Sequence, residues 1–421
     1  MPGKHGLRRL VPYLAAAALA MAVVACTGTG VYPNTTFEPK TDLGRSIDNL
    51  WNLLLLLGTI VFVLVEAALL FIVWKYRHRG QEEMPPQIHG SVKLEVLWTL
   101  IPAVILVFIA VPTVRTVFET QAPAPRDALQ VEVVGHQWWW EFRYPEYDIV
   151  TANELYLPIG RAVNFGLRTR DVLHSFWIPQ LGAKRDLISN HTNYVWFTAD
   201  STPVGVWNGF CMEYCGASHA NMHFRVFTVT AEEFESWAAG QAAPASFGAT
   251  ATAAPVAATA LAVVDTTPAA EETTVTPPRP VTAGFTWPAE RLPRYAVPSR
   301  PLPDVPFDDN LAGDPARGQQ IFSSSACIGC HMIRGNPMAI GTIGPNLTHF
   351  GSRHTLAAGM YPNDARHLAR WIKNAPRMKP GSLMQAFGRG EFDLRTNAPV
   401  TAGGLEDQQI ADIVAYLRAL K

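Results

Sequence analysis

A short cysteine-rich stretch carries the side chains best suited to binding a metal. Residues 211–222 read Cys-Met-Glu-Tyr-Cys-Gly-Ala-Ser-His-Ala-Asn-Met, which gathers two thiols, an imidazole and a thioether. Thiolates and thioethers are soft donors that favour copper, and imidazole binds copper, zinc, iron or nickel. A blue-copper site needs only one cysteine, so a second thiolate suggests two copper ions bridged by two sulfurs. His174 is the best candidate for the further imidazole that such a pair needs.

Two other interpretations fit the same side chains. In an oxidising compartment, Cys211 and Cys215 could form a disulfide. Alternatively, these two cysteines, His219 and a distant histidine could hold structural zinc. A bare Cys-x3-Cys pair favours the disulfide, but His219 follows after a further four-residue step and Met222 lies beyond it. The added imidazole and thioether favour copper.

A second motif, near the C-terminus, predicts covalently bound haem. Residues 327–331 read Cys-Ile-Gly-Cys-His, the Cys-x2-Cys-His pattern of c-type haem attachment. Cys327 and Cys330 would form thioethers to the haem vinyl groups, and His331 would be the proximal ligand. A thioredoxin-like redox pair is the alternative, but no strand–helix–strand pattern surrounds the motif. A methionine as sixth ligand would raise the haem potential and leave no open iron position for substrate.

Two long apolar runs predict membrane-spanning helices. Residues 50–74 are almost continuously apolar, and at about 1.5 Å per residue they exceed the roughly 30 Å hydrocarbon core of a bilayer. The second run covers about 94–117, where Pro102 and Pro112 are expected to kink the helix without ending it. Basic residues directly follow the first run, which predicts that this end is cytoplasmic. The resulting hairpin returns the chain to the outer face of the membrane.

The N-terminus has the pattern of an export signal. Basic residues precede an apolar run over residues 11–25 that is too short to span a bilayer. Val-Val-Ala-Cys at 23–26 matches a bacterial lipobox, which predicts a lipid anchor on Cys26 after cleavage. Cleavage elsewhere nearby is the alternative. Either way, we expect the mature N-terminus outside the cytoplasm.

The composition changes twice between the membrane hairpin and the haem motif. From Leu129 onward, short runs of Val, Phe, Trp and Tyr punctuated by Pro and Gly predict a sandwich or barrel. Residues 241–280 are then dominated by Ala, Thr and Pro, which have little apolar surface to bury and predict a linker that continues to about Pro306. The expected strands are 129–134, 138–143, 162–169, 194–198 and 224–230, and the expected helices after the strands are 232–239, 316–324 and 405–420.

The composition and motifs also exclude several classes of function. A net charge of −1 provides no general attraction to nucleic acid. No catalytic nucleophile, acid–base pair or phosphate-binding loop is recognisable, so hydrolytic and phosphoryl-transfer chemistry lack support. Each of the five cysteines falls in one of the motifs above, so no structural disulfide is required.

Together these motifs resemble subunit II of haem-copper cytochrome c oxidases, followed by a class I cytochrome c domain over about 308–421. The oxidase resemblance covers roughly residues 45–237 and rests on the cysteine stretch, on the segment 171–179 and on Gly-His-Gln-Trp-Trp-Trp-Glu-Phe at 135–142. One departure is Ile-Ser-Asn at 188–190, where the family often has Pro-Gly-Arg, away from every ligand. The resemblance implies a cupredoxin-like Greek-key barrel with a dinuclear copper centre, CuA. The implied ligands are His174, Cys211, Cys215, His219, Met222 and the backbone carbonyl of Glu213.

The resemblance also implies roles for residues outside the copper site. The family places the tryptophan through which electrons enter at the first of three consecutive tryptophans, Trp138. Glu95 matches a glutamate through which protons enter from the cytoplasm, the alternative being a charge at a helix end. Met378 and Met384 are candidates for the sixth haem ligand. The family pattern puts this ligand after a Pro-Gly turn, which favours Met384.

The function implied is electron transfer within a respiratory oxidase of the bacterial cell membrane. Electrons would pass from a soluble c-type cytochrome, or another outer-face donor, to haem c, then to CuA and then to subunit I, where oxygen is reduced to water. The alternatives are a copper subunit of a nitric oxide reductase and a stand-alone membrane electron carrier. A quinol-oxidising version is disfavoured because the copper ligands are intact. Other membrane subunits and lipid are further expected partners.

The expected organisation is signal peptide 1–25, outer-face segment 26–45, transmembrane hairpin 46–118, cupredoxin-like domain 119–238, linker 239–307 and cytochrome c domain 308–421.

Overall fold

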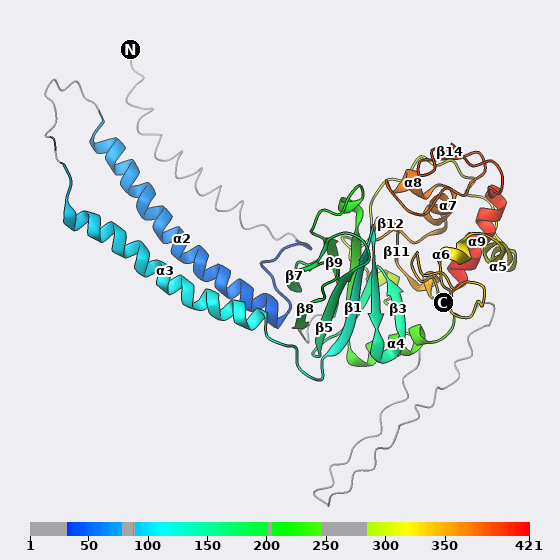
Figure 1. The fold of residues 1–421 in the computed structure, drawn as a ribbon, viewed down its shortest axis with the longest axis horizontal. Coiled ribbons are helices and arrows are strands. Elements are labelled where there is room, and N and C mark those ends of the chain that lie inside the picture. Colours follow the sequence, from blue (N-terminus) through cyan, green and yellow to red (C-terminus); the bar gives the residue numbers. More distant parts are fainter. Residues whose placement is uncertain (1–31, 78–86, 88, 201–203, 246–283) are drawn as a thin grey trace, which may run out of the picture.

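The computed structural model describes residues 32–77, 87, 89–200, 204–245 and 284–421 (Figure 1). The predicted export signal, with Cys26, and most of the predicted linker lie outside the described residues. A two-helix hairpin and a helical C-terminal domain lie on opposite sides of a central β-sandwich. This arrangement confirms the three-part architecture predicted from the sequence.

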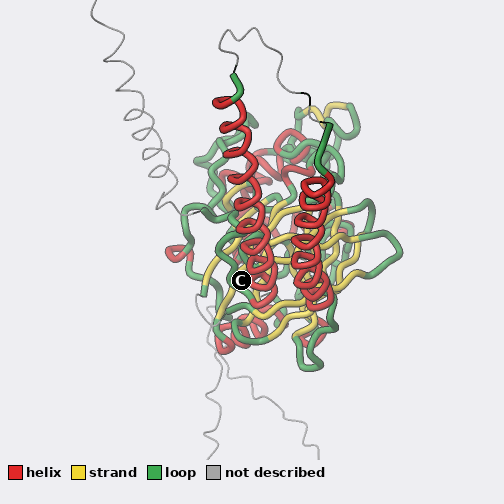
Figure 2. The backbone as a smooth tube through the Cα atoms, turned by 90° about the vertical axis from the view of Figure 1, so that its left-hand side faces the viewer, coloured by secondary structure: helices red, strands yellow, loops and turns green. Residues whose placement is uncertain are grey.

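The hairpin consists of α2 (Asp42–Lys75) and α3 (Val92–Thr120), which lie side by side in Figure 2. Both helices are long and apolar enough to cross a membrane, and most of their side chains are exposed on the chain alone. Helix α2 begins at an N-cap, where Thr41 Oγ1 accepts a hydrogen bond from the Gly44 amide, 3.0 Å away. Pro102 and Pro112 lie inside α3 and do not end it, as predicted.

The central domain is a sandwich of two five-stranded sheets, ordered β3-β2-β1-β5-β8 and β4-β10-β9-β6-β7. Strands β1 and β5 pair in parallel, as do β4 and β10, and the other pairs within the two sheets are antiparallel. Aromatic rings fill the space between the sheets; the rings of Phe176 and Phe224 stack with centroids 5.1 Å apart. The strands are β1 (Leu129–His136), β2 (Trp139–Tyr144), β3 (Ile149–Ala152), β4 (Glu154–Pro158), β5 (Ala162–Thr169), β6 (His174–Ile178), β7 (Gly182–Leu187), β8 (Asn193–Thr198), β9 (Gly205–Cys211) and β10 (His223–Val229).

Strand β9 is central to its sheet but was not among the strands predicted from the sequence. It contains two glycines and an asparagine, which are depleted in strands. Gly209 is required by a close contact, because a Cβ atom there would lie 2.1 Å from Cζ of Phe224. Gly209 therefore lowers the strand propensity of β9 but leaves the space that the buried Phe224 ring occupies.

The C-terminal domain is built around the packing of α9 (Asp407–Ala419) on α5 (Pro315–Ser324), as the cytochrome resemblance implied. Gly318 permits their close approach, since a Cβ atom there would lie 2.0 Å from the backbone oxygen of Asp412. The Asp412 carboxylate also accepts two 3.0 Å hydrogen bonds from Arg317. The remaining elements are α6 (Cys327–Cys330), α7 (Ala365–Lys373), α8 (Ala375–Met378) and the short strands β11 (Thr355–Leu356), β12 (Tyr361–Pro362), β13 (Phe392–Asp393) and β14 (Ala398–Pro399).

Part of the predicted linker is folded onto the sandwich. Helix α4 (Ala231–Ala242) closes the β-domain and begins with a capping box between Thr230 and Glu233. From residue 284 the chain returns, and Trp287 and Ala296 join the buried core of the sandwich. The structure therefore differs from the expectation of a linker that continues to about Pro306. The large side chain of Trp287 has apolar surface to bury, which the Ala/Thr/Pro stretch lacks.

The C-terminal domain lies directly against the sandwich. The buried carboxylate of Glu154 on β4 accepts hydrogen bonds from the backbone amides of His354 and Thr355, at 2.7 and 2.9 Å. On β10, the amide of His223 donates to the carbonyl of Ala358 at 3.1 Å. These contacts bring the two predicted cofactor sites to facing surfaces.

Candidate metal centre and haem pocket

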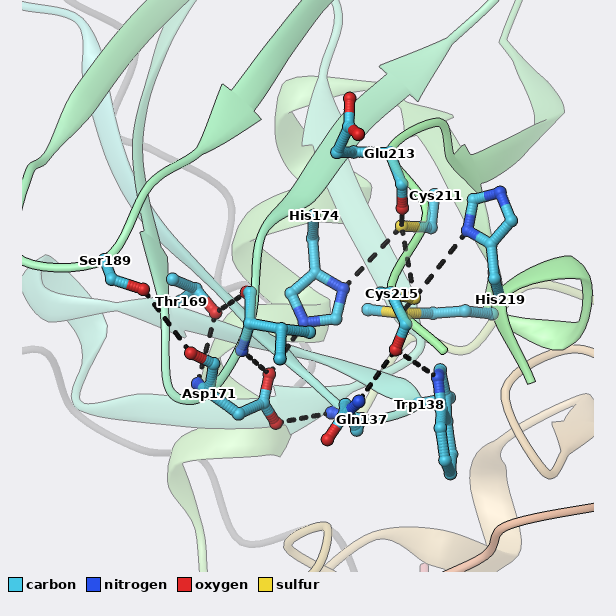
Figure 3. A network of polar contacts seen from close by, with 12 residues as sticks. Gln137, Trp138, Thr169, Asp171, His174, Ser189, Cys211, Glu213, Cys215 and His219 are labelled. Carbon is cyan, nitrogen blue, oxygen red and sulfur yellow. Dashed lines mark hydrogen bonds and ion pairs between the residues drawn. The ribbon is translucent and has the colours of Figure 1, made fainter. Parts of the chain in front are cut away.

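All six predicted copper ligands converge at one end of the second sheet, and five of them, all but Met222, are labelled in Figure 3. Cys211 Sγ lies 3.8 Å from Cys215 Sγ and 3.7 Å from His174 Nδ1. Cys215 Sγ lies 3.7 Å from His219 Nδ1 and 3.9 Å from Met222 Sδ. The backbone oxygen of Glu213 lies 3.3 Å from Cys211 Sγ. The other donors therefore surround the two cysteine sulfurs.

Sheet register explains why His174 meets a loop far away in the sequence. Strand β6 pairs with β9 so that Phe176 faces Cys211, and His174 lies two residues earlier on the same face of β6. The amide of Cys211 also donates to the carbonyl of Met222 at 3.1 Å, which closes the loop between β9 and β10. The register thus brings the histidine of one strand to the cysteine that ends its neighbour.

The donor set fits a pair of copper ions. Cys211 and Cys215 are free thiols, so the disulfide interpretation finds no support. His174 and Met222 are fully buried, and both cysteines are nearly so. Two thiolates, two imidazoles, a thioether and a carbonyl exceed the four ligands of a structural zinc site and match the soft donors that copper prefers.

Of the two thiols, Cys211 loses its proton more readily than Cys215. The hydrogen bond with Cys215 lowers the pKa of Cys211 well below its usual range, and the same interaction raises the pKa of Cys215. A thiolate is therefore available at neutral pH as a metal ligand. Ligation would require the second thiol to lose its proton as well, which a bound cation favours.

Asp171 orients His174 from behind the metal centre. Its carboxylate accepts hydrogen bonds from His174 Nε2 at 2.8 Å and from the Gln137 amide at 2.7 Å. Burial raises the pKa of Asp171, but the hydrogen bonds from His174 and Gln137 outweigh burial and lower the pKa overall. Because Nε2 of His174 bonds to Asp171, its Nδ1 faces Cys211. The sequence reasoning did not assign this role to Asp171, although the residue lies three positions before His174.

We expect Asp171→Asn to weaken copper binding by about 10- to 100-fold, because an amide orients and polarises the imidazole less strongly than a carboxylate. The affinity would be measured by titrating the copper-loaded protein with a competing chelator. Asp186→Asn is the matched control, since Asp186 lies on β7 opposite Ser175 and its side chain is exposed. Equal affinities in the two variants would contradict the role given to Asp171.

The haem motif opens into a cavity of about 230 Å³ between the two domains. Cys327, Cys330 and His331 line it on the C-terminal side, and both cysteines are free. His331 Nδ1 donates to the carbonyl of Pro345 at 2.8 Å, which leaves Nε2 for the iron. Burial lowers the pKa of His331 and keeps the imidazole neutral, as ligation requires. These residues fit covalently attached haem.

The two methionine candidates lie in different surroundings. Met384 lines the cavity with the haem motif. Met378 is buried in the hydrophobic core of the C-terminal domain and does not line the cavity. This geometry favours Met384 over Met378 as the sixth ligand.

Trp138 lies between the two predicted cofactor sites, whereas Glu95 is remote from both. The indole of Trp138 lines the haem cavity, and its Nε1–H donates to the carbonyl of Cys215 at 2.9 Å. Gln137 Nε2 donates to the same carbonyl at 2.7 Å. Glu95 lies in the first turn of α3, at the end of the hairpin farthest from the sandwich.

Comparisons with known proteins cover most of the chain. Residues 39–116 match the model of the cytochrome c oxidase subunit II transmembrane domain, 148–229 match its periplasmic domain, and 315–421 match cytochrome c. The chain is 30% identical over 393 residues to cytochrome c oxidase subunit 2 of Alkalihalophilus pseudofirmus, covering 92% of this chain and 91% of that protein. It is 30% identical over 361 residues to cytochrome c oxidase subunit 2 of Bacillus sp. PS3, covering 82% and 79%.

Among solved structures, the periplasmic domain of subunit II of cytochrome oxidase from Bradyrhizobium japonicum matches 27% of this chain and 93% of its own, with 29% identity and a TM-score of 0.26. The full-length relatives and the three family models agree with the order of elements in the fold. The chain therefore belongs to the subunit II family of haem-copper cytochrome c oxidases, which transfers electrons to subunit I, and it carries a fused C-terminal cytochrome c domain.

Proposed function

We propose that electrons from a soluble c-type cytochrome, or another outer-face donor, enter this chain at haem c and leave it from CuA. The observation that supports this order is the position of Trp138, which lines the haem cavity and hydrogen-bonds to the backbone of the predicted copper ligand Cys215. Trp138 is only 9% exposed, because the C-terminal domain covers it. A soluble donor therefore reaches the haem domain more readily than Trp138.

The C-terminal domain would hold the haem through four side chains. Cys327 and Cys330 would attach it covalently, while His331 and Met384 would bind the iron from its two sides. The carbonyl of Pro345 holds His331 in one orientation. Gly344 gives the ring room, since a Cβ atom there would lie 2.6 Å from Cε1 of His331. Haem held by His331 and Met384 would supply electron transfer rather than oxygen chemistry.

The sandwich would hold two copper ions through the six converged donors. When bound, the copper pair and haem c supply reversible one-electron chemistry. The protein contributes donors from the start of β6, the end of β9 and the loop between β9 and β10, with His174, Cys211, Cys215 and Met222 buried, so the donors are already in place. Ligands of this set are His174, Cys211, the Glu213 carbonyl, Cys215, His219 and Met222.

The test is oxygen uptake by the complex that co-purifies with this chain, supplied with reduced cytochrome c. Rapid, cyanide-sensitive uptake is the expected result, with haem c and copper reduced before the haem of subunit I. Consumption of nitric oxide without oxygen uptake would assign the subunit to a nitric oxide reductase. Purification without partner subunits and without either activity would indicate a stand-alone electron carrier.

Glu95 is proposed as the point where protons enter from the cytoplasm. Its position in the first turn of α3, next to the predicted cytoplasmic connection of the hairpin, supports this role. Glu95→Gln keeps the side-chain shape but cannot carry a proton, so we expect slower oxygen reduction with normal reduction of haem c by its donor. Glu119→Gln, at the opposite end of α3, is the control. Unchanged oxygen reduction in Glu95→Gln would leave the glutamate as a helix-end charge only.

A further inference from the structure

A buried lysine of the cytochrome domain reaches into the copper domain. Lys379 follows α8 and is only 4% exposed. Its Nζ donates to three backbone carbonyls, those of Trp138 at 2.6 Å, Asn221 at 3.1 Å and Ala357 at 3.1 Å. A lysine ammonium has three donors, and each finds one acceptor here. Two of the three acceptors belong to the copper domain, so the lysine bonds the two domains together.

The acceptors are close to the electron route proposed above. Trp138 is the predicted point of electron entry, and Asn221 immediately precedes the predicted copper ligand Met222. Ala357 belongs to the turn between β11 and β12 in the cytochrome domain. The single ammonium group thus contacts Trp138, the loop between β9 and β10 and the cytochrome domain.

The residues after Lys379 continue this contact. Ser218 of the copper loop donates its hydroxyl to the carbonyl of Pro380 at 2.6 Å. Gly381 has a φ of +79° and lies so close to Trp138 that a Cβ atom would be 2.6 Å from Cη2 of the indole. Three residues later the chain reaches Met384 in the haem cavity. The segment 379–384 therefore touches the indole at one end and the predicted haem ligand position at the other.

We infer that Lys379 is a positioning residue for electron transfer from haem c to copper, holding segment 379–384 against Trp138 in a fixed junction. This inference rests on the proposed order of electron transfer. It adds that the transfer occurs in the docked arrangement and requires no movement of the cytochrome domain.

The rest of the interface is consistent with a fixed junction. The Glu154 carboxylate, buried on β4, accepts two backbone amides of the cytochrome domain, as described above. Arg225 on β10 is 6% exposed and donates to the carbonyls of Ala296 and Gly359. Charged groups are seldom buried without such partners, and these partners lie across the domain boundary or on the segment packed along it. Separation of the domains would break the Glu154 contacts and the Arg225–Gly359 contact together.

The test compares Lys379→Met with Lys373→Met in the assembled oxidase. Lys373 is also buried in the cytochrome domain, but its Nζ bonds to Asp407 within that domain, 2.8 Å away. Haem c is reduced by electron injection from a photoexcited donor complex with a sacrificial reductant present, and the appearance of electrons on copper is followed optically. Lys379→Met should slow this step about tenfold or more, since small displacements of reacting groups have effects of that size. Lys373→Met should keep the normal rate.

Two further readouts separate positioning from general damage. The haem spectrum and the copper content of Lys379→Met should match those of the unchanged protein, whereas hydrogen exchange at the His223 amide should accelerate, because that amide bonds across the interface. If Lys379→Met fails to assemble, Gly381→Ala replaces it and should slow the same step by displacing the turn from Trp138. Lengthening the chain between residues 246 and 283 should leave the rate unchanged.

A normal transfer rate in a folded Lys379→Met or Gly381→Ala variant would overturn the positioning role. A rate that falls when the chain between 246 and 283 is lengthened would overturn the fixed junction. Absence of haem-to-copper transfer in the unchanged protein would instead reject the proposed electron order. The three outcomes are therefore distinguishable.

Discussion

Cys215→Ser is expected to abolish the dinuclear copper signal while leaving haem c in place. Cys215 Sγ lies within 4 Å of Cys211 Sγ, His219 Nδ1 and Met222 Sδ, so it is one of the two sulfurs around which the other predicted ligands gather. A serine hydroxyl is a hard, neutral donor and cannot bridge two soft copper ions. Electron paramagnetic resonance would report the copper pair, and the haem absorption spectrum would report the cytochrome domain. Oxygen uptake should fall to background.

The reciprocal variant Cys330→Ser provides the control for this experiment. It removes one predicted thioether to the haem but leaves the copper loop unchanged, so the dinuclear copper signal should persist. Retention of a normal dinuclear signal in Cys215→Ser would contradict the ligand assignment. Loss of both copper and haem in either variant would indicate misfolding rather than lost ligation, and circular dichroism would identify that case.

Met384→Ala is expected to lower the midpoint potential of haem c and to open the iron to added ligands. Ligation by methionine and histidine raises the haem potential, so removal of the thioether should reverse that effect. Met384 lines the haem cavity, and alanine at this position cannot reach an iron held by Cys327, Cys330 and His331. Redox titration would measure the potential, and binding of cyanide to the oxidised haem would detect the open position.

Met378→Ala is the matched control for the methionine assignment. Met378 is 3% exposed and belongs to the hydrophobic core of the cytochrome domain. Its truncation should destabilise the domain by about 2–5 kcal/mol, the usual cost of removing a buried methionine, without changing the haem potential. If only Met378→Ala shifted the potential, the assignment of Met384 would be wrong.

The sequence was most informative where the chemistry is local. Five of the six predicted copper ligands lie within residues 211–222, and the haem-attaching cysteines and proximal histidine are within five residues of one another. Such spacing restricts the donors to one small volume whatever the rest of the chain does. The membrane helices are equally local, because an apolar run long enough to cross a bilayer needs no partner to be recognised. These features determined the family and the expected cofactors.

The sequence was less informative where residues act through distant neighbours. Asp171 and Gln137 were not assigned supporting roles, because their contacts with His174 and Cys215 depend on how strands and loops meet. The β9 strand was missed because Gly209 lowers its strand propensity, although the Phe224 ring requires that glycine. Propensity describes a residue by itself, whereas these positions are decided by what packs against them.

The sequence by itself determined which side chains could bind copper and haem, that the chain has a membrane hairpin, and that a β-domain and a cytochrome c domain follow it in order. Only the tertiary structure decided that the two cofactor sites face each other. Trp138 and Lys379 are 241 residues apart, yet the Nζ of one bonds to the carbonyl of the other. That contact depends on the docking of two separately folded surfaces, and no local pattern of residue types encodes how two such surfaces meet.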